Sequence, residues 1–296
     1  MDMTREIRIE EGKLKVVFEI QENGVVELKQ FDSAGRMDVK ERDRGEEDFY
    51  PITEVQITGR GTRGMHAYKH NVSGGATDFV YQSHEVLENE KGKELIIHTA
   101  TEYGVKGEYH MQFYPNVAAV QVWTILKNEG TEEIGLEYVS SFIYQGLCQS
   151  GEKPYFEKTS IYTPHNSWDC ESQWRKNDCR EINLSGMAVN GFNTPGFGMN
   201  RYCYGGHSSW STCEYLPMGI CEDEECKVTY FFQVEHSGQW LIEYGPSTGE
   251  RLYVALSGAT ETEHGWWKNL KPGDTFTTVP AGLVWQMVTL TKQWQN

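Results

Sequence analysis

The sequence predicts an all-β fold, which we expect to be a large two-layer antiparallel β-supersandwich. Short segments rich in β-branched and aromatic residues recur along the chain, and many of them alternate polar with apolar residues. Glycine, asparagine, aspartate and proline separate these segments. Alternation with period two between turn residues is the signature of half-buried strands. No segment carries the apolar stripe of a helix of three turns.

The expected strands begin near the N-terminus and continue to the end of the chain. They are residues 13–20, 24–31, 52–58, 79–87, 93–102, 107–114, 117–127, 134–144, 228–234, 240–244, 252–256 and 276–291. We expect hairpin turns at 22–24 and 127–130, where asparagine and glycine accept positive φ angles at little cost. Residues 146–218 interrupt the pattern and are rich in Gly, Asn, Ser, Trp, Tyr and Cys. Long irregular segments of this kind are often functional.

Charge and cysteine content limit the partners of this chain of 296 residues, which we expect to form one domain over 1–296. Its net charge of −16, from 27 basic and 43 acidic residues, disfavours nucleic acid and anionic membranes as partners. The first residues, 1–6, lack the apolar segment of a signal peptide. We therefore expect a cytoplasmic protein whose seven cysteines are free thiols.

Three clusters combine tryptophan with polar side chains, and they fall at 165–175, 208–218 and 264–268. Sugars bind to flat aromatic faces together with amides and carboxylates that pair with hydroxyl groups. Taken alone, each cluster is more typical of buried or interface aromatic anchors than of a sugar platform. One ring stacked on a pyranose buries on the order of 60–80 Å², worth roughly 2 kcal/mol, whereas a millimolar ligand needs about 4 kcal/mol. A useful sugar site therefore needs several groups or a partner domain.

Signals for metal or cofactor chemistry are weak, and we expect neither a metal nor a cofactor. His66 and His70 are four residues apart, but the glycines around them favour a loop over a helix. Cys221 and Cys226 flank an acidic run that is typical of a hairpin turn more than of a zinc site. The sequence contains no GxSxG motif, P-loop or dinucleotide fingerprint, and spacing singles out no catalytic carboxylate pair.

Seven segments in one order resemble the N-terminal domain of glycoside hydrolase family 36, the retaining α-galactosidases. They contain FYPITEVQITG (49–59), HAYKH (66–70), VYQSHE (80–85), HNSWDCESQWR (165–175), SSWSTCEYLPMG (208–219), QVEHSGQW (233–240) and EHGWWKNLKPGDTFTTVP (263–280). The resemblance implies a β-supersandwich that precedes a catalytic (β/α)₈ barrel, absent from this chain. Two barrel aspartates would perform the hydrolysis of terminal α-galactosides, so no catalytic residue is assigned here.

The resemblance also implies that the domain helps to shape the galactose pocket and takes part in homo-oligomer contacts. The implied substrate-binding residues are Glu54 and Gln56 after the Tyr-Pro segment, and Trp168 with Asn166 and Glu171. The sequence departs from the family pattern at Asp169-Cys170, and also at Gln56, where many members carry arginine. The preferred α-galactoside, and whether an N-acetylated sugar is accepted, stay open.

Two alternatives assign a function to the chain alone. The first is an aldose-1-epimerase-like enzyme, in which a histidine acid and a glutamate base open a pyranose ring. Its candidate residues are His66, His110 or His236 with Glu108 or Glu235. The second alternative is a non-catalytic carbohydrate-binding module, suggested by nine tryptophans and sixteen tyrosines.

Overall fold

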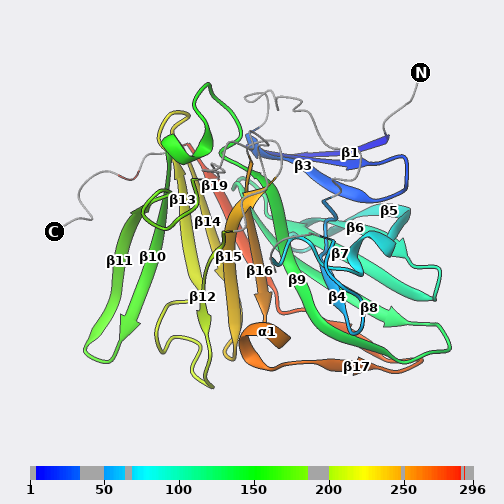
Figure 1. Ribbon diagram of the computed structural model, residues 1–296. Helices are drawn as coiled ribbons and strands as arrows, with labels where there is room; N and C mark the ends of the chain where they lie inside the picture. Colours follow the sequence, from blue (N-terminus) through cyan, green and yellow to red (C-terminus); the bar gives the residue numbers. More distant parts are fainter. Residues whose placement is uncertain are drawn as a thin grey trace, which may run out of the picture.

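The computed structural model describes residues 5–33, 50–63, 69–185, 200–247, 251–287 and 290. It confirms the predicted all-β sandwich: the described strands form three antiparallel sheets that pack over a shared core (Figure 1). Three short helical segments accompany them, η1 (Ala76–Asp78), η2 (Tyr155–Glu157) and α1 (Glu261–His264). Among the described residues, no helix has the length and apolar character needed to cross a membrane.

The largest sheet has ten strands in the order β11-β10-β13-β14-β19-β8-β7-β6-β5, with β18 also paired to β8. The strands are β5 (Val80–Asn89), β6 (Gly92–Ala100), β7 (Val105–Phe113), β8 (Ala119–Asn128), β10 (Thr159–Ser167), β11 (Cys170–Asp178), β13 (Met218–Asp223), β14 (Val228–Val234), β18 (Thr275–Thr277) and β19 (Ala281–Gln286).

A six-stranded sheet packs against it in the order β12-β15-β16-β9-β17, with β4 paired to β9, and a three-stranded sheet has the order β1-β2-β3. Their strands are β4 (Val55–Ile57), β9 (Ile134–Leu147), β12 (Tyr202–Gly206), β15 (Trp240–Ser247), β16 (Arg251–Gly258) and β17 (Lys268–Leu270), then β1 (Arg5–Glu11), β2 (Leu14–Ile20) and β3 (Val26–Ser33).

Aromatic side chains from all three sheets fill the core. Phe31 of β3 contacts Phe142 and Tyr144 of β9, with ring centroids 6.1 and 6.3 Å apart. The rings of Phe232 of β14 and Tyr244 of β15 have centroids 6.4 Å apart, and this contact joins the ten-stranded sheet to the six-stranded one. These side chains are almost fully buried. Burying a large apolar side chain contributes about 1.5–3 kcal/mol, so the contacts between sheets hold the sandwich together.

The structure corrects three of the predicted local features. The segment 146–218, expected to interrupt the strand pattern, contains β10, β11 and β12. The turn at 127–130 is not a hairpin, because β8 and β9 belong to different sheets and the chain crosses between them there. The Asn128 side chain fixes this crossover: its amide donates to the carbonyls of Glu132 and Leu270, and its oxygen accepts from Gly130 N–H. The segment predicted as one strand over 276–291 contains β18 and β19, which are interrupted before Pro280, a residue without an N–H to donate.

Other local predictions are confirmed. The turn at 22–24 connects the paired strands β2 and β3, with Gly24 at a φ of 85°. The acidic run between Cys221 and Cys226 spans the end of β13 and the hairpin turn into the paired strand β14. All seven cysteines are free thiols, as expected.

Candidate functional site: a rim that carries tryptophans

The three tryptophan clusters of the sequence lie along one rim of the sandwich. The β10–β11 turn, the segment between β12 and β13, and the segment that contains α1 all lie along the lower edge in Figure 1. Each contributes one strongly exposed tryptophan, with exposed fractions of 77% for Trp168, 61% for Trp210 and 65% for Trp267. Exposed large aromatic side chains from separate segments on one edge are typical of a binding surface.

Trp168 and Trp210 form a stacked pair at this rim. Their ring centroids are 6.2 Å apart and the ring planes differ by 25°. Trp168 occupies the turn between β10 and β11, where Asp169 has a φ of 60° and Ser167 pairs with Cys170. A tight turn of this kind directs its side chains away from the sheet. Much of both rings stays exposed, so the pair offers the adjacent aromatic surfaces that one isolated ring cannot supply.

Asn166 fixes the hairpin to the neighbouring loop instead of facing solvent. Its side-chain amide donates to the Thr212 carbonyl, and its side-chain oxygen accepts from Ser172 N–H at 3.0 Å. Its backbone N–H donates to the Glu214 carbonyl at 2.8 Å. Asn166 therefore positions the segments that carry Trp168 and Trp210, and its own amide is already engaged.

Polar groups flank the tryptophan pair. Glu171 is exposed on β11, as are Gln173 and Arg175 of the same strand. His165 packs against Tyr215 with centroids 4.9 Å apart. Burial and the charge of Arg175 lower the pKa of His165, which favours the neutral imidazole at neutral pH. The rim thus combines two aromatic faces with a carboxylate, an amide and a guanidinium.

The third segment of the rim is attached through a pair of histidines. His207 and His264 stack with centroids 5.0 Å apart and planes 25° apart. Burial, and secondly the nearby His207, lower the pKa of His264. The side chain of Gln239 donates to the His207 carbonyl at 3.1 Å. The stacked histidines join the loop that carries Trp210 to the α1 segment, and Gln239 joins the same loop to the β14–β15 connection.

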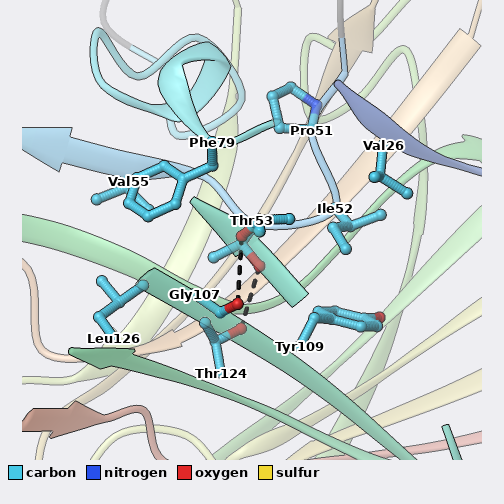
Figure 2. A pocket seen from close by; sticks show the side chains of 11 residues that line it. Val26, Pro51, Ile52, Thr53, Val55, Phe79, Gly107, Tyr109, Thr124 and Leu126 are labelled. Atoms are coloured by element: carbon cyan, nitrogen blue, oxygen red, sulfur yellow. Dashed lines mark hydrogen bonds between the residues drawn. The ribbon is translucent and has the colours of Figure 1, made fainter. Parts of the chain in front are cut away.

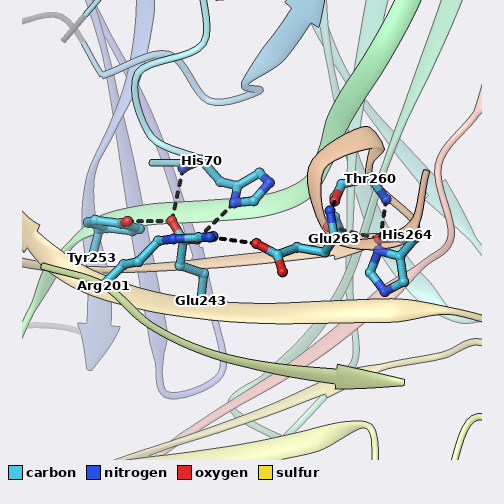
Figure 3. A network of polar contacts seen from close by, with 9 residues as sticks. His70, Arg201, Glu243, Tyr253, Thr260, Glu263 and His264 are labelled. Carbon is cyan, nitrogen blue, oxygen red and sulfur yellow. Dashed lines mark hydrogen bonds and ion pairs between the residues drawn. The ribbon is translucent and has the colours of Figure 1, made fainter. Parts of the chain in front are cut away.

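A buried ionic network supports α1 from the outer side of the six-stranded sheet (Figure 3). The carboxylate of Glu243 accepts from the backbone N–H of His70, from Arg201 Nη1 at 2.8 Å and from the Tyr253 hydroxyl, and its Oε2 lies 2.8 Å from His70 Nδ1. Arg201 also donates to Glu263 of α1 at 2.6 Å. Burial alone would raise the pKa of Glu243, but His70 and Arg201 hold it at about 2. The sequence offered no signal for this network, because its members come from distant segments.

Glu54 and Gln56, implied as substrate-binding residues, lie inside the structure at β4. Glu54 is fully buried, its carboxylate pairs with Arg63 and it accepts from Ser73 N–H at 2.9 Å. Burial raises the pKa of Glu54 although the charge of Arg63 opposes the rise. The Gln56 side chain bonds to the carbonyl of Arg60 and accepts from Gly74 N–H. In this arrangement both residues hold the segments on either side of 64–68.

The structure does not bring the two groups of implied residues together. β4 and the β10–β11 hairpin, which carries Trp168, lie at opposite sides of the molecule (Figure 1). That Glu54, Gln56 and Trp168 contribute to one galactose pocket therefore stays a prediction. It would require either a rearranged loop or residues from a second chain.

Of the candidates for an epimerase, the structure brings together His110 and Glu108, whose Nε2 and Oε2 atoms are 3.5 Å apart on the outer face of the ten-stranded sheet. The carboxylate of Glu235 accepts from the side chain of Gln121. His66 lies outside the described residues.

A small cavity between the sheets is excluded as a sugar pocket by its size. It has a volume of about 20 Å³ and is lined by Val26, Thr53, Phe79 and their neighbours (Figure 2). That volume holds about one water molecule. The hydroxyl groups of Thr53 and Thr124, 3.1 Å apart, face each other there.

One group of potential metal ligands is already neutralised by a lysine. Ligand atoms of Asp223, Glu225 and Cys226 lie within 4.8 Å of one another. The Lys158 ammonium lies 2.8 Å from Asp223 and 3.4 Å from Glu225, and its side chain is 1% exposed. This buried ammonium occupies the place that a metal cation would take. The acidic run therefore forms part of the β13–β14 hairpin, as the sequence indicates.

The fold places the chain in a structural class that is found within family 36 α-galactosidases. Two solved examples come from Geobacillus stearothermophilus: AgaB covers 96% of this chain with a TM-score of 0.73 at 12% identity, and AgaA covers 95% with a TM-score of 0.71 at 13% identity. The Slr1438 protein from Synechocystis sp. PCC 6803 matches with a TM-score of 0.53 at 10% identity and covers 97% of each chain.

At these identities the likeness establishes the fold, and it confirms the predicted resemblance at that level. The chain spans 40% of the length of the AgaA and AgaB structures. No protein-family model and no curated protein matches the sequence.

Proposed function

We propose that this chain is the sandwich domain of a retaining family 36 α-galactosidase and that a (β/α)₈ barrel outside it supplies the catalytic carboxylates. The observation that carries this proposal is the match of 95% of the chain to 40% of α-galactosidase structures. In this role the domain shapes the galactose pocket and takes part in contacts between subunits of the longer enzyme.

The tryptophan rim is our proposed contribution to sugar binding. Trp168 and Trp210 offer adjacent aromatic faces, and Glu171 is free to accept hydrogen bonds from sugar hydroxyls. Two platforms of roughly 2 kcal/mol each reach the approximately 4 kcal/mol of a millimolar ligand. We therefore expect the domain alone to bind the sugar weakly. A barrel that closes the pocket should strengthen this binding.

Calorimetric titration of the chain with melibiose and raffinose tests the proposed rim. We expect a dissociation constant of the order of millimolar, weakened about 30-fold in Trp168→Ala and in Trp210→Ala, because each ring contributes roughly 2 kcal/mol. Within the rim, the proposed sugar platform is the stacked pair of Trp168 and Trp210. Trp267→Ala is therefore the matched control, because it removes a similarly exposed ring outside that pair. Equal affinity in all three variants, or no heat at high millimolar sugar, contradicts the proposed rim.

A stand-alone carbohydrate-binding module is a second candidate, motivated by the exposed tryptophans of the rim; the match to Slr1438 over 97% of both chains shows that a chain of similar length has this fold. It differs from the first proposal in requiring no barrel. The discriminating measurement is hydrolysis of an aryl α-galactoside by the chain joined to a family 36 barrel. Activity that depends on the sandwich favours the first proposal, and activity indifferent to it favours the module.

A further inference from the structure

Two histidines and three glutamates gather on the outer face of the ten-stranded sheet, away from the tryptophan rim. His98 of β6 is the direct cross-strand partner of Glu108 of β7, and His110 follows two residues later on β7. Side chains two residues apart on a strand project from the same face of a sheet. Glu94 of β6 and Glu85 of β5 contact these histidines from either side.

Each imidazole uses one ring nitrogen to contact a carboxylate and turns the other toward Glu108. His110 Nδ1 lies 2.8 Å from Glu94, and its Nε2 lies 3.5 Å from Glu108 Oε2. His98 Nε2 lies 3.3 Å from Glu85, and its Nδ1 lies 4.0 Å from Glu108 Oε1. Histidines that bind metals almost always donate their second nitrogen to a carboxylate or carbonyl, which orients the ring. This arrangement occurs twice around Glu108.

The surroundings of His110 give a second, independent observation. Its side chain is 9% exposed, and its ring stacks on Trp123 with centroids 4.8 Å apart and planes 11° apart. Its Nε2 is buried and has no hydrogen-bond partner in the described part of the chain. Buried polar atoms in folded proteins are nearly always paired. A buried nitrogen directed toward a carboxylate, but too far away to bond with it, is therefore suited to a bound ion.

The charge of the cluster favours a cation. Three carboxylates surround the two imidazoles, and the nearby lysines pair with other acids: Lys93 with Glu11, and both Lys106 and Lys127 with Glu129. Imidazole nitrogen and carboxylate oxygen together suit Zn²⁺ and related transition metals more than Mg²⁺ or Ca²⁺.

We propose that His98, Glu108 and His110 form a binding site for one divalent transition-metal ion of the Zn²⁺ type. Ligand atoms of a tetrahedral zinc site lie about 3.4 Å apart, given metal–ligand bonds of about 2.1 Å. The separation of Glu108 from His110 already fits, and His98 must move inward. The exposed fractions of 32% for His98 and 45% for Glu108 leave both side chains free to rotate. A bound ion would join β6 to β7 next to the exposed edge strand β5.

Calorimetric titration of the full chain with ZnCl₂ tests the proposal. We expect one tight site per chain, and affinity at least tenfold lower in Glu108→Gln, which keeps the shape of an exposed side chain, and in His98→Ala. Glu94→Gln should lower affinity by about 10–100-fold through the orientation of His110. His84→Ala is the matched control, because His84 is exposed on β5 and bonds to Tyr81 outside the cluster.

The free thiols need a separate control, because cysteines also bind zinc. Cys226→Ser should leave the tight site unchanged. Absence of tight binding in the wild-type chain, or equal binding in Glu108→Gln, overturns the proposal. Loss of the tight site in Cys226→Ser does so too, because the ion would then sit at the thiol. None of these outcomes depends on sugar binding or hydrolysis, so they are independent of the proposed function.

Discussion

Replacing Glu243 with glutamine tests the buried network that supports the α1 end of the rim. The Glu243 carboxylate is fully buried and bonds to His70, Arg201 and Tyr253. Its pKa of about 2 in the folded protein compares with an ordinary value of 4.5. Each pKa unit corresponds to about 1.4 kcal/mol, so the charged carboxylate contributes about 3 kcal/mol to folding at neutral pH. Glu243→Gln should lower the free energy of unfolding by about that amount at pH 7.

The pH dependence follows from the direction of this pKa change. A carboxylate whose pKa is lowered by folding stabilises the protein above its unfolded pKa, and this stabilisation disappears as pH falls through the folded value. The difference between wild type and Glu243→Gln should therefore be complete above about pH 5 and shrink toward pH 2. Urea unfolding followed by tryptophan fluorescence measures it, with the exposed Glu102→Gln as control. Equal stability of wild type and Glu243→Gln at pH 7, or a difference that does not change with pH, would refute the reasoning.

Three further predictions use the same stability assay. Gly74→Ala should destabilise the protein by more than about 2 kcal/mol, because the added Cβ collides with the Gly61 carbonyl, whereas Gly61→Ala faces open space and should change little. Lys69→Met should stabilise the protein by about 2 kcal/mol at pH 7: burial lowers the pKa of Lys69 from 10.5 to about 8, which corresponds to about 3 kcal/mol, and loss of its hydrogen bond to the Pro246 carbonyl offsets about 1 kcal/mol. That gain should shrink as pH rises through 8 and disappear above 10.5, where the lysine is neutral in both states; a gain independent of pH contradicts this cause. Trp168→Ala and Trp210→Ala should each change stability by less than about 0.5 kcal/mol, since both rings are exposed, and a larger loss would assign them a structural role.

The strand pattern was predictable for many strands with one buried face, although β1, where the buried Ile7 and Ile9 flank the exposed Arg8, was not predicted. Alternation along β8 and β14 reflects one side chain in the core and the next outside it. β11 was not predicted, because this edge strand is exposed on both faces and its sequence therefore shows no period of two. β10 was missed for a related reason: its last residues leave the core and alternation ends. Sequence periodicity reports burial, and it gives no signal for strands that extend beyond the core.

The sequence predicted which residue types form the candidate site, but it did not predict which of these residues contact one another. Tryptophans flanked by amides and carboxylates pointed to the segments around Trp168 and Trp210, and the fold places these segments at one rim. A side-chain pairing joins Glu243 of β15 to Arg201, which directly precedes β12, and these two residues are 42 positions apart in the sequence. The cluster around Glu108 depends on the register of β6 against β7, which no local motif specifies. Contacts set by register or by distant segments required the structure.

Hydrolysis of an aryl α-galactoside tests the central claim most directly, namely that this sandwich serves a catalytic barrel that lies outside it. The chain alone should release no product, because its aspartates and glutamates are not expected to include the catalytic pair. The chain joined to a family 36 barrel should hydrolyse the substrate, with kcat/KM reduced about tenfold when Trp168 becomes alanine. Turnover by the chain alone, or full activity of the joined enzyme without that tryptophan, would contradict the account.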